Sequence, residues 1–280
     1  MDNYRPLEES LKGKAVLVTG GTYGIAKSIV EAFCYAGSRV IFCARNEEKG
    51  RENAKRFSRK YKTECVFLHC DVTDYAEIEQ VVEETAKRFN GIDILINCAG
   101  YWPAQLPIDE PTIEDFNKLL QTNMVAYYAF CKYALPYIRA AKGNIVNIGS
   151  VIGMTGKEGA AMYCSTKGAI DSMTKALAVD EARNCVRVNE VKPGHIKNEG
   201  FYETLENSEA PESFQEYSDG LQWMGRGGTT DEVARAVLFM ASDWASFITG
   251  ASLVVSGGYE IGEGRKAPLY HWDSMEIKSV

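Results

Sequence analysis

The sequence has no long uncharged apolar run, no basic cluster and few histidines, and each absence argues against a class of function. A membrane span needs about eighteen consecutive apolar residues, and no stretch of the sequence is that long. The polar start "MDNYRPLEESLKGK" lacks the apolar core of a secretory signal. We therefore expect a cytoplasmic protein without a membrane span. A formal net charge of −7 argues against a nucleic-acid partner. Three scattered histidines and the lack of a C-x-x-C pair argue against a metal site.

The sequence has eight cysteines, more than its three histidines. Most of the eight cysteines lie in apolar runs such as "VIFCA" and "CVFLHC", which indicates reduced core thiols rather than a disulfide framework. The 280 residues are 45% hydrophobic and 25% charged, as in ordinary globular proteins. Since no linker or composition shift divides the chain, we expect one domain over residues 1–280.

Short apolar runs alternate with amphipathic stretches along the whole chain. The runs are rich in Val and Ile and lie at 15–19, 39–44, 65–70, 93–99, 144–149, 186–191 and 252–256. Helical patterns lie between them at 24–36, 47–61, 74–89, 112–135, 160–183 and 230–242. Runs that are apolar on both faces suit central strands of a parallel sheet. The alternation predicts an α/β fold, a Rossmann-type doubly wound parallel sheet of about seven strands flanked by helices.

One long stretch, 194–229, shows no clear pattern and interrupts this alternation. A long irregular loop in a compact domain is usually functional or disordered. We interpret it as an insertion beside the substrate.

The segment "AVLVTGGTYGIAKSIVEAF" (15–33) runs from a buried strand through a glycine turn into an amphipathic helix. Glycines allow a tight turn, and the N–H groups of a helix N-terminus bind pyrophosphate, so the segment indicates a dinucleotide site. Gly20 and Gly24 stand four residues apart, and Ala26 occupies the place of a third glycine. A structural turn is the alternative reading.

The end of the second predicted strand bears on the choice of cofactor. An acidic residue there binds the ribose 2′-hydroxyl of NAD, whereas an arginine accommodates the 2′-phosphate of NADP. The sequence has Ala44 and then Arg45, which favours NADP(H) over NAD(H). An ordinary surface arginine is the alternative.

Several motifs occur in one order along the chain: "TGGTYGI" (19–25), "NCAG" (97–100), Ser150, "YCSTK" (163–167) and "KPGHI" (192–196). Together they resemble the short-chain dehydrogenase/reductase family over roughly residues 10–265. Ser150 precedes Tyr163 by the family's usual thirteen residues. Within the family the chain looks most like the 17β-hydroxysteroid dehydrogenase type 14 and retinal short-chain dehydrogenase branch, on segments such as "ALPYIRAAKGNIVNI" and "GRGGTTDEVARAVLFMASD".

The resemblance implies four catalytic residues. Tyr163 would exchange a proton with the substrate oxygen, and Lys167, one helical turn away, would lower its pKa by positive charge. Ser150 would hydrogen-bond the carbonyl oxygen. Asn123 matches the family's helix asparagine that holds a water linked to the lysine. Local roles are the alternatives: Ser150 as a helix cap, Asn123 as a helix irregularity and Lys167 as a solvated cation.

The resemblance also implies cofactor contacts at Gly20, Thr22, Tyr23, Gly24, Ile25, Arg45, Asp71, Val72, Asn97, Ala99, Gly100, Tyr163, Lys167, Pro193, Gly194, Ile196 and Asn198. Asp71 would lie near the adenine, with a helix cap as its alternative role. Ala26, Cys98 and Asn198 depart from the family pattern, so we expect weaker or altered cofactor affinity rather than its loss.

Substrate residues are expected around the catalytic tyrosine, namely Trp102, Ser150, Tyr163, His195 and Phe201. The 194–229 stretch is rich in aromatics, and between 199 and 219 it has seven acids and no Lys or Arg. These features favour a hydrophobic secondary alcohol or ketone, steroid-like or retinoid-like. The alternatives are a 3-oxoacyl-thioester reductase and a non-catalytic dinucleotide-binding regulator. The resemblance further implies a homotetramer to which the tail 266–280 contributes.

Overall fold

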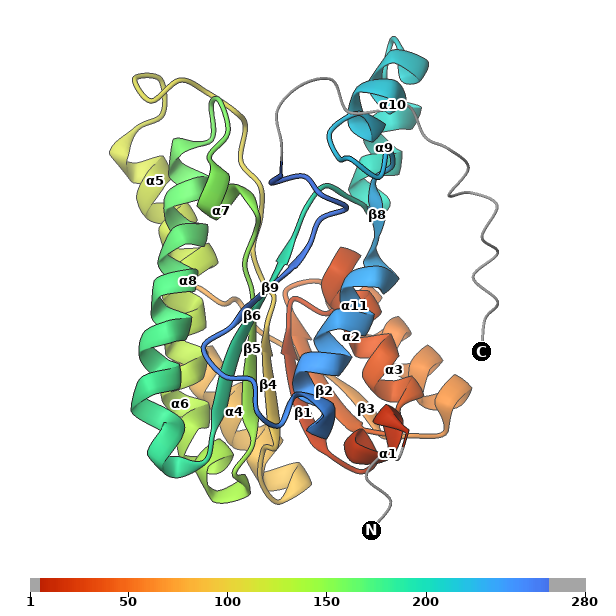
Figure 1. Ribbon diagram of the computed structural model, residues 1–280. Coiled ribbons are helices and arrows are strands. Elements are labelled where there is room, and N and C mark those ends of the chain that lie inside the picture. Colours follow the sequence, from red (N-terminus) through yellow and green to blue (C-terminus); the bar gives the residue numbers. More distant parts are fainter. Residues whose placement is uncertain (1–5, 262–280) are drawn as a thin grey trace.

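Seven parallel strands form the centre of the computed structural model, which describes residues 6–261 (Figure 1). Their order is β3-β2-β1-β4-β5-β6-β9. The bounds are β1 (Ala15–Thr19), β2 (Arg39–Ala44), β3 (Cys65–His69), β4 (Ile94–Asn97), β5 (Asn144–Ile148), β6 (Arg187–Pro193) and β9 (Ser252–Val255). The chain turns back at β1 and continues outward from β4, so a topological switch point lies between these two strands. The predicted fold class is confirmed.

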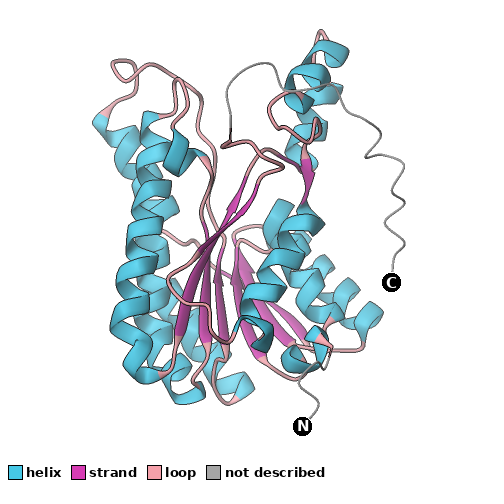
Figure 2. Ribbon diagram, viewed as in Figure 1, coloured by secondary structure: helices cyan, strands magenta, loops and turns pink. Residues whose placement is uncertain are grey.

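Helices cover both faces of the sheet (Figure 2). On one face lie α1 (Leu7–Leu11), α2 (Gly24–Tyr35), α3 (Glu47–Tyr61) and α11 (Thr230–Ala241). On the other lie α4 (Tyr75–Phe89), α5 (Ile113–Leu120), α6 (Ala126–Ala141) and α8 (Ala161–Glu181). Two apolar cores result. One joins α2 and α11 to the sheet, and the other joins α4 and α6 to its opposite face.

The predicted helix 112–135 is three elements rather than one. After α5 the chain forms a π-helical turn, η1 (Gln121–Val125), and then α6, which continues to Ala141 through Pro136. Proline has no backbone N–H, so Pro136 cannot donate the helical hydrogen bond to the carbonyl of Lys132. Both residues face solvent. Water can therefore replace the lost bond.

The prediction that 194–229 is irregular is wrong. This stretch contains β7 (Ile196–Lys197), α9 (Glu199–Glu206), α10 (Pro211–Asp219) and β8 (Gly228–Thr229), and β7 pairs with β8 in parallel. The short helix α7 (Ile152–Thr155) also escaped prediction. In Figure 1, α7, α9 and α10 lie at one end of the sheet. The tail 266–280 lies outside the described residues.

Cysteine burial agrees with the interpretation of core thiols for five positions, Cys34, Cys43, Cys65, Cys70 and Cys131, whereas Cys185 is exposed. Within residues 6–261, no helix is both long and apolar enough to span a membrane.

A buried chain of amides joins the two central strands to the helices behind the site. The Asn97 side chain donates to Asn147 Oδ1 at 2.9 Å and to Cys131 Sγ at 3.3 Å, and Asn147 donates to Thr174 Oγ1 at 2.9 Å. Asn97, Asn147 and Thr174 are fully buried. Buried polar groups stabilise a fold only when they are paired, so this chain fixes the spacing of β4, β5 and α8.

Replacement of Asn147 by Ala removes the centre of this chain. The Asn97 amide loses its acceptor and a cavity remains, so we expect Asn147→Ala to lower the free energy of unfolding by about 2–4 kcal/mol. Urea unfolding followed by circular dichroism measures it. Asn117→Ala, at an exposed position on α5, is the matched control with an expected change under about 0.5 kcal/mol. Equal changes in the two variants would refute the structural role of the amide chain.

Candidate active site

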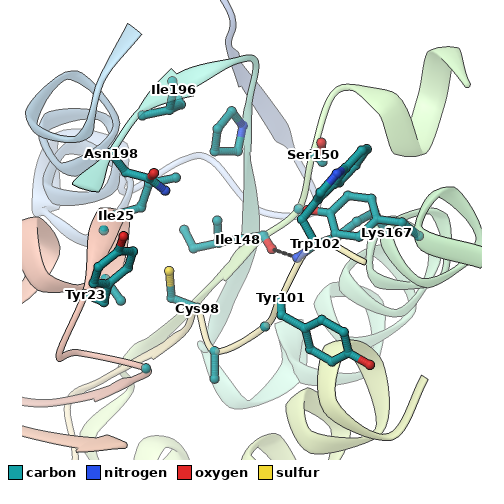
Figure 3. A pocket seen from close by; sticks show the side chains of 18 of the residues that line it. Tyr23, Ile25, Cys98, Tyr101, Trp102, Ile148, Ser150, Lys167, Ile196 and Asn198 are labelled. Atoms are coloured by element: carbon teal, nitrogen blue, oxygen red, sulfur yellow. Dashed lines mark hydrogen bonds between the residues drawn. The ribbon is translucent and has the colours of Figure 1, made fainter. Parts of the chain in front are cut away.

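Two adjoining cavities open at the carboxyl ends of the central strands. One, of about 320 Å³, is lined by the glycine turn, the loop after β4, the end of β5 and the start of α8 (Figure 3). The other, of about 780 Å³, extends toward α9 and α10. Both are lined by Ser150 and Tyr163. A group at this junction can act on a molecule that reaches from one cavity into the other.

The glycine turn between β1 and α2 packs tightly against the loop after β4. Gly20 has a φ of +81°, and a Cβ there would lie 2.9 Å from Ala99 Cα. Gly24, with a φ of +56°, starts α2. The turn thus lines the smaller cavity with backbone and leads into a helix N-terminus. This cradle fits the pyrophosphate of a dinucleotide.

The helix α8 carries Tyr163 and Lys167 on one face. Lys167 Nζ donates to the Ile148 carbonyl at 2.9 Å (Figure 3) and lies 5.7 Å from the centre of the Tyr163 ring. Only 5% of Lys167 is exposed, so the solvated alternative is wrong. Gly153 makes room for the lysine, because a Cβ at Gly153 would lie 2.9 Å from Lys167 Cβ.

Burial governs the ionisation of both residues. It lowers the pKa of Lys167 to about 8. Burial also raises the pKa of Tyr163 well above its usual value; Cys98 adds to the rise, and a hydrogen bond with Ser150 opposes it. This direction is opposite to the one expected from the charge of Lys167, because the loss of water around the phenolate outweighs the attraction.

Ser150 and Asn123 approach the site from opposite sides. Ser150 follows β5 and lines both cavities. Asn123 is fully buried in the π-helical turn, where its amide accepts from the Tyr101 N–H at 3.0 Å and donates to the Tyr101 carbonyl at 2.9 Å. Asn123 therefore holds the loop after β4. Asn123 also lies in a π-helical turn, so the alternative prediction of a helix irregularity at this residue is correct.

Twelve of the residues predicted to bind the cofactor line the smaller cavity: Gly20, Tyr23, Gly24, Ile25, Ala99, Gly100, Tyr163, Lys167, Pro193, Gly194, Ile196 and Asn198. The other predicted residues, Thr22, Arg45, Asp71, Val72 and Asn97, do not. Cys98, Tyr101, Ile148 and Gly149 line it without having been predicted as contacts. Their positions could have indicated them, since Cys98 and Tyr101 lie in the loop after β4 and Ile148 and Gly149 lie at the end of β5.

The residues outside the smaller cavity have identifiable surroundings. The Asn97 side chain belongs to the buried amide chain. Asp71 accepts from the Thr73 N–H at 2.9 Å, whereas Asp74 caps α4, so the helix-cap alternative for Asp71 is wrong. Arg45 is exposed and lines a separate hollow of about 710 Å³ beside α5, which Tyr101 also lines.

A carboxylate already occupies the start of α2. The Gly24 N–H donates to Glu199 Oε2 at 3.0 Å, and Lys27 forms an ion pair with the same side chain. Burial raises the pKa of Glu199, but Lys27 and the N–H donors outweigh it and hold this pKa below its usual value. Asn198 caps α9 by accepting from the Phe201 N–H at 3.1 Å. A negative group is therefore stabilised where a phosphate would bind.

All five predicted substrate residues, Trp102, Ser150, Tyr163, His195 and Phe201, line the larger cavity. The Trp102 ring packs edge-on against Tyr163 with 4.5 Å between centroids. His195 lies within hydrogen-bonding distance of Ser218 Oγ, at 2.7 Å. Gln105, Lys157 and Tyr259 line the cavity too but were not predicted. Lys157 lies between Ser150 and Tyr163 in the sequence, which was the signal for it.

The charge argument about the substrate needs correction. None of the seven acids between 199 and 219 lines either cavity among the described residues. Five are exposed, Glu199 is paired with Lys27, and Asp219 is paired with Lys197 at 2.6 Å. Lys157 lines the larger cavity, so a basic residue lies beside it although the stretch 199–219 contains none.

Comparisons with known proteins agree with this geometry. A short-chain dehydrogenase model described as enoyl-(acyl carrier protein) reductase matches residues 20–260. The L-fucose dehydrogenase of Mus musculus is 43% identical over 256 residues, which cover 91% of each chain. The meso-2,3-butanediol dehydrogenase of Serratia marcescens is 32% identical over 90% of this chain and 96% of its own.

A solved structure shows the same arrangement. The ligand-free aldohexose dehydrogenase of Thermoplasma acidophilum superposes with a TM-score of 0.81 at 30% identity, covering 92% of this chain and 98% of its own. The chain therefore belongs to the short-chain dehydrogenase/reductase family and is an NAD(P)-dependent oxidoreductase that acts on CH–OH groups.

Proposed function

We propose that this chain interconverts a hydroxyl and a carbonyl group on a monosaccharide-sized polyol, with Tyr163 moving the proton. The observation that carries the reaction is the position of Tyr163 and Ser150 where the two cavities meet, with Lys167 beside them in the lining of the smaller cavity. The named activities of the L-fucose and aldohexose dehydrogenases support a sugar as substrate.

The lining of the larger cavity supports a polyhydroxylated substrate. It combines the polar side chains of Gln105, Lys157, Thr204 and His195 with the ring of Trp102. An apolar ligand that covers polar side chains removes them from water at a cost, whereas the hydroxyl groups of a sugar can pair with those, such as Gln105 and Lys157, that face it. The aromatic ring can cover the apolar face of such a molecule.

The side chains have distinct tasks in this reaction. A nicotinamide cofactor held in the smaller cavity would supply the donor or acceptor of the hydride. Tyr163 takes the hydroxyl proton in oxidation and returns it in reduction. Ser150 donates a hydrogen bond to the substrate oxygen. Burial raises the pKa of Tyr163, and a hydrogen bond with Ser150 opposes the rise. The ammonium group of Lys167, 5.7 Å from the centre of the Tyr163 ring, would favour the phenolate by its positive charge.

A hydrophobic alcohol is the second candidate substrate. Phe201 stacks on Phe214 with 5.4 Å between centroids, and Tyr217 and Leu221 extend this apolar wall of the larger cavity. The wall supports the steroid- or retinoid-like substrate expected from the sequence, together with the resemblance to the 17β-hydroxysteroid dehydrogenase type 14 and retinal branch.

The remaining alternatives have less support. A 3-oxoacyl-thioester reductase would use the same proton transfer, and two observations favour it: Lys157 lines the larger cavity, and the matching family model is described as enoyl-(acyl carrier protein) reductase. A non-catalytic regulator would have no need of a complete set of proton-transfer residues. The homotetramer, the single domain over 1–280 and the cytoplasmic location stay predictions.

NADP(H) is the proposed cofactor. Ala44 ends β2 where an acid would bind a ribose 2′-hydroxyl, and Arg45 follows it. Two hydrogen bonds from Thr73 and, after them, the charge of Arg45 hold the pKa of Asp71 low. The positive charge of Arg45 would attract the 2′-phosphate of NADP, whereas an acidic residue in that place would repel it.

Turnover on a panel of alcohols tests the proposed function. We expect L-fucose and related aldoses to give the highest kcat/KM with NADP⁺, above steroids, retinoids and β-hydroxyacyl thioesters. In Tyr163→Phe, kcat should fall about 10²–10⁴-fold because the proton acceptor is lost, while cofactor affinity changes by less than about threefold. Steady-state absorbance of the reduced cofactor measures it.

Tyr128→Phe, at an exposed position on α6, is the matched control and should retain full activity. Full activity in Tyr163→Phe would contradict the mechanism. Turnover confined to steroids or retinoids would instead replace the sugar by the second candidate.

Removal of the Arg45 charge tests the cofactor preference. We expect Arg45→Gln to raise the Kd for NADPH about tenfold and to leave the Kd for NADH nearly unchanged, since only NADPH carries the 2′-phosphate. Fluorescence titration of each nucleotide measures both constants. Arg51→Gln, an exposed position one turn into α3, should change neither. Equal losses for NADH and NADPH would disprove the assignment.

The carboxylate at the start of α2 should weaken dinucleotide binding. Glu199→Gln removes a negative charge that competes for the Gly24 N–H, so we expect the Kd for both nucleotides to fall about three- to tenfold. The same fluorescence titration measures it. Glu206→Gln, exposed at the end of α9, is the control and should have no effect. Unchanged or weaker binding in Glu199→Gln would exclude the competition.

A further inference from the structure

A second buried cluster of charges lies behind the catalytic residues. It is formed by Glu190 and Lys192 on β6 and by Asp171 on α8, one helical turn after Lys167. Glu190 is fully buried and only 4% of Lys192 is exposed. Ionised groups are seldom removed from water to this extent without a partner. The steps of catalysis described above do not use this cluster.

Asp171 holds most of the positive charge in the cluster. Its two oxygens lie 2.6 Å from Lys192 Nζ and 2.5 Å from Lys175 Nζ. Ser252 Oγ on β9 lies 2.7 Å from Asp171 and 2.9 Å from Glu190 Oε2. Since one hydroxyl has a single proton to donate, Ser252 cannot serve both carboxylates at once. Lys192 Nζ also lies 3.4 Å from Glu190 Oε2, farther than the 2.6 Å that separates it from Asp171. Glu190 is therefore the less satisfied of the two acids.

The free oxygen of Glu190 lies beside the backbone that holds the catalytic lysine. Among the described residues, Glu190 Oε1 is buried and has no hydrogen-bond partner. A Cβ on Gly149 would lie 1.7 Å from this oxygen, so only glycine leaves space for it. Gly149 follows Ile148, whose carbonyl accepts from Lys167. The carboxylate and the ammonium group thus flank one short backbone segment.

We propose that Glu190 is a positioning residue for the dehydrogenase reaction, whose buried carboxylate stabilises the ammonium form of Lys167 from behind the Ile148–Gly149 backbone. The attraction acts through space in a medium that screens charge poorly. Glu190 touches neither cavity among the described residues, so it acts on Tyr163 only through Lys167. The proposal rests on the family's reaction and is independent of the sugar as substrate.

The ionisation of the two residues defines where the attraction operates. Burial raises the pKa of Glu190 to about 7, while Lys192 and the hydroxyl of Ser252 oppose the rise and Asp171 adds to it. The pKa of Lys167 is about 8, and Glu190 is one of the groups that raise it against burial. Glu190 is neutral well below pH 7 and Lys167 is neutral well above pH 8. Both carry charge between these values.

Other charged and titratable groups face the pair from each neighbouring element. Toward Glu190 these are Lys192 on its own strand, Asp171 and Lys175 on α8, and Tyr127 on α6. Toward Lys167 they are Cys98, Tyr127 and Tyr163. Among these groups, burial raises the pKa of Asp171, but its hydrogen bonds with Lys175, Lys192 and Ser252 outweigh burial and hold this pKa below its usual value. The pKa of Lys175 is raised by its hydrogen bond with Asp171. Both keep their charge throughout pH 5.5–8, so they do not produce a change in coupling over this range.

A double-mutant cycle on stability tests the coupling without any substrate. The full chain, Glu190→Gln, Lys167→Met and the double variant are unfolded in urea at pH 7.5 and pH 5.5. We expect the two substitutions to be coupled about three- to thirtyfold in the unfolding equilibrium constant at pH 7.5. At pH 5.5, where Glu190 is neutral, the coupling should vanish. A cycle of Glu181→Gln with Lys167→Met is the control, since Glu181 is buried far along α8 and paired with Arg139.

Coupling that is absent at pH 7.5, equal at both pH values or matched by the Glu181 cycle would overturn the proposal. The pH profile of kcat/KM gives a second readout that does not need Lys167→Met to fold. In Glu190→Gln the alkaline limb, where Lys167 loses its proton, should move to lower pH by about 0.5–1 unit. A superimposable profile in an active variant would contradict the proposal. If the substrate is not a sugar, the expected results of the double-mutant cycle and of the pH profile stay the same.

Discussion

A positive charge removed from water is the constraint on which the site depends. Lys167 is almost completely buried, and within residues 6–261 no carboxylate forms an ion pair with it. The Ile148 carbonyl and the rings of Tyr127 and Tyr163, at 5.4 and 5.7 Å, surround its ammonium group instead. A buried cation costs several kcal/mol unless such groups compensate it. The end of β5 and the start of α8 must therefore keep one relative position.

The strands were predictable because they are short apolar runs bounded by polar residues or turns, and the five central ones are buried on both faces, whereas the edge strands β3 and β9 are only partly buried. The predicted runs 15–19 and 39–44 coincide with β1 and β2, and the others differ by a few residues at their ends. The helices α9 and α10 were missed for the opposite reason: they are short, and most of their residues face solvent. Pro136 also misled the prediction, because its cost depends on whether water can reach the carbonyl that it leaves free.

The residues proposed for catalysis were predictable from motifs that are local in the sequence. Tyr163 and Lys167 share a helix face by their spacing, and Ser150 ends the neighbouring strand. Glu199 and Glu190 give no such signal. Glu199 meets Gly24 across 175 residues of chain, and Glu190 meets Gly149 only because β5 and β6 pair in one register. A charge whose partner lies on another element can be found only after the elements are placed.

The helix α9 connects the two cavities physically. Its first residue, Glu199, holds the start of α2, and Phe201, two residues later, is part of the substrate wall. Two negative groups cannot share one helix N-terminus without repulsion. A dinucleotide phosphate at Gly24 would therefore displace Glu199. The helix α9 is short, and its cap, Asn198, also lines the smaller cavity, so a movement of Glu199 would also move Phe201. The shape of the larger cavity is in this way tied to the occupant of the glycine turn, through a helix that the sequence pattern did not indicate.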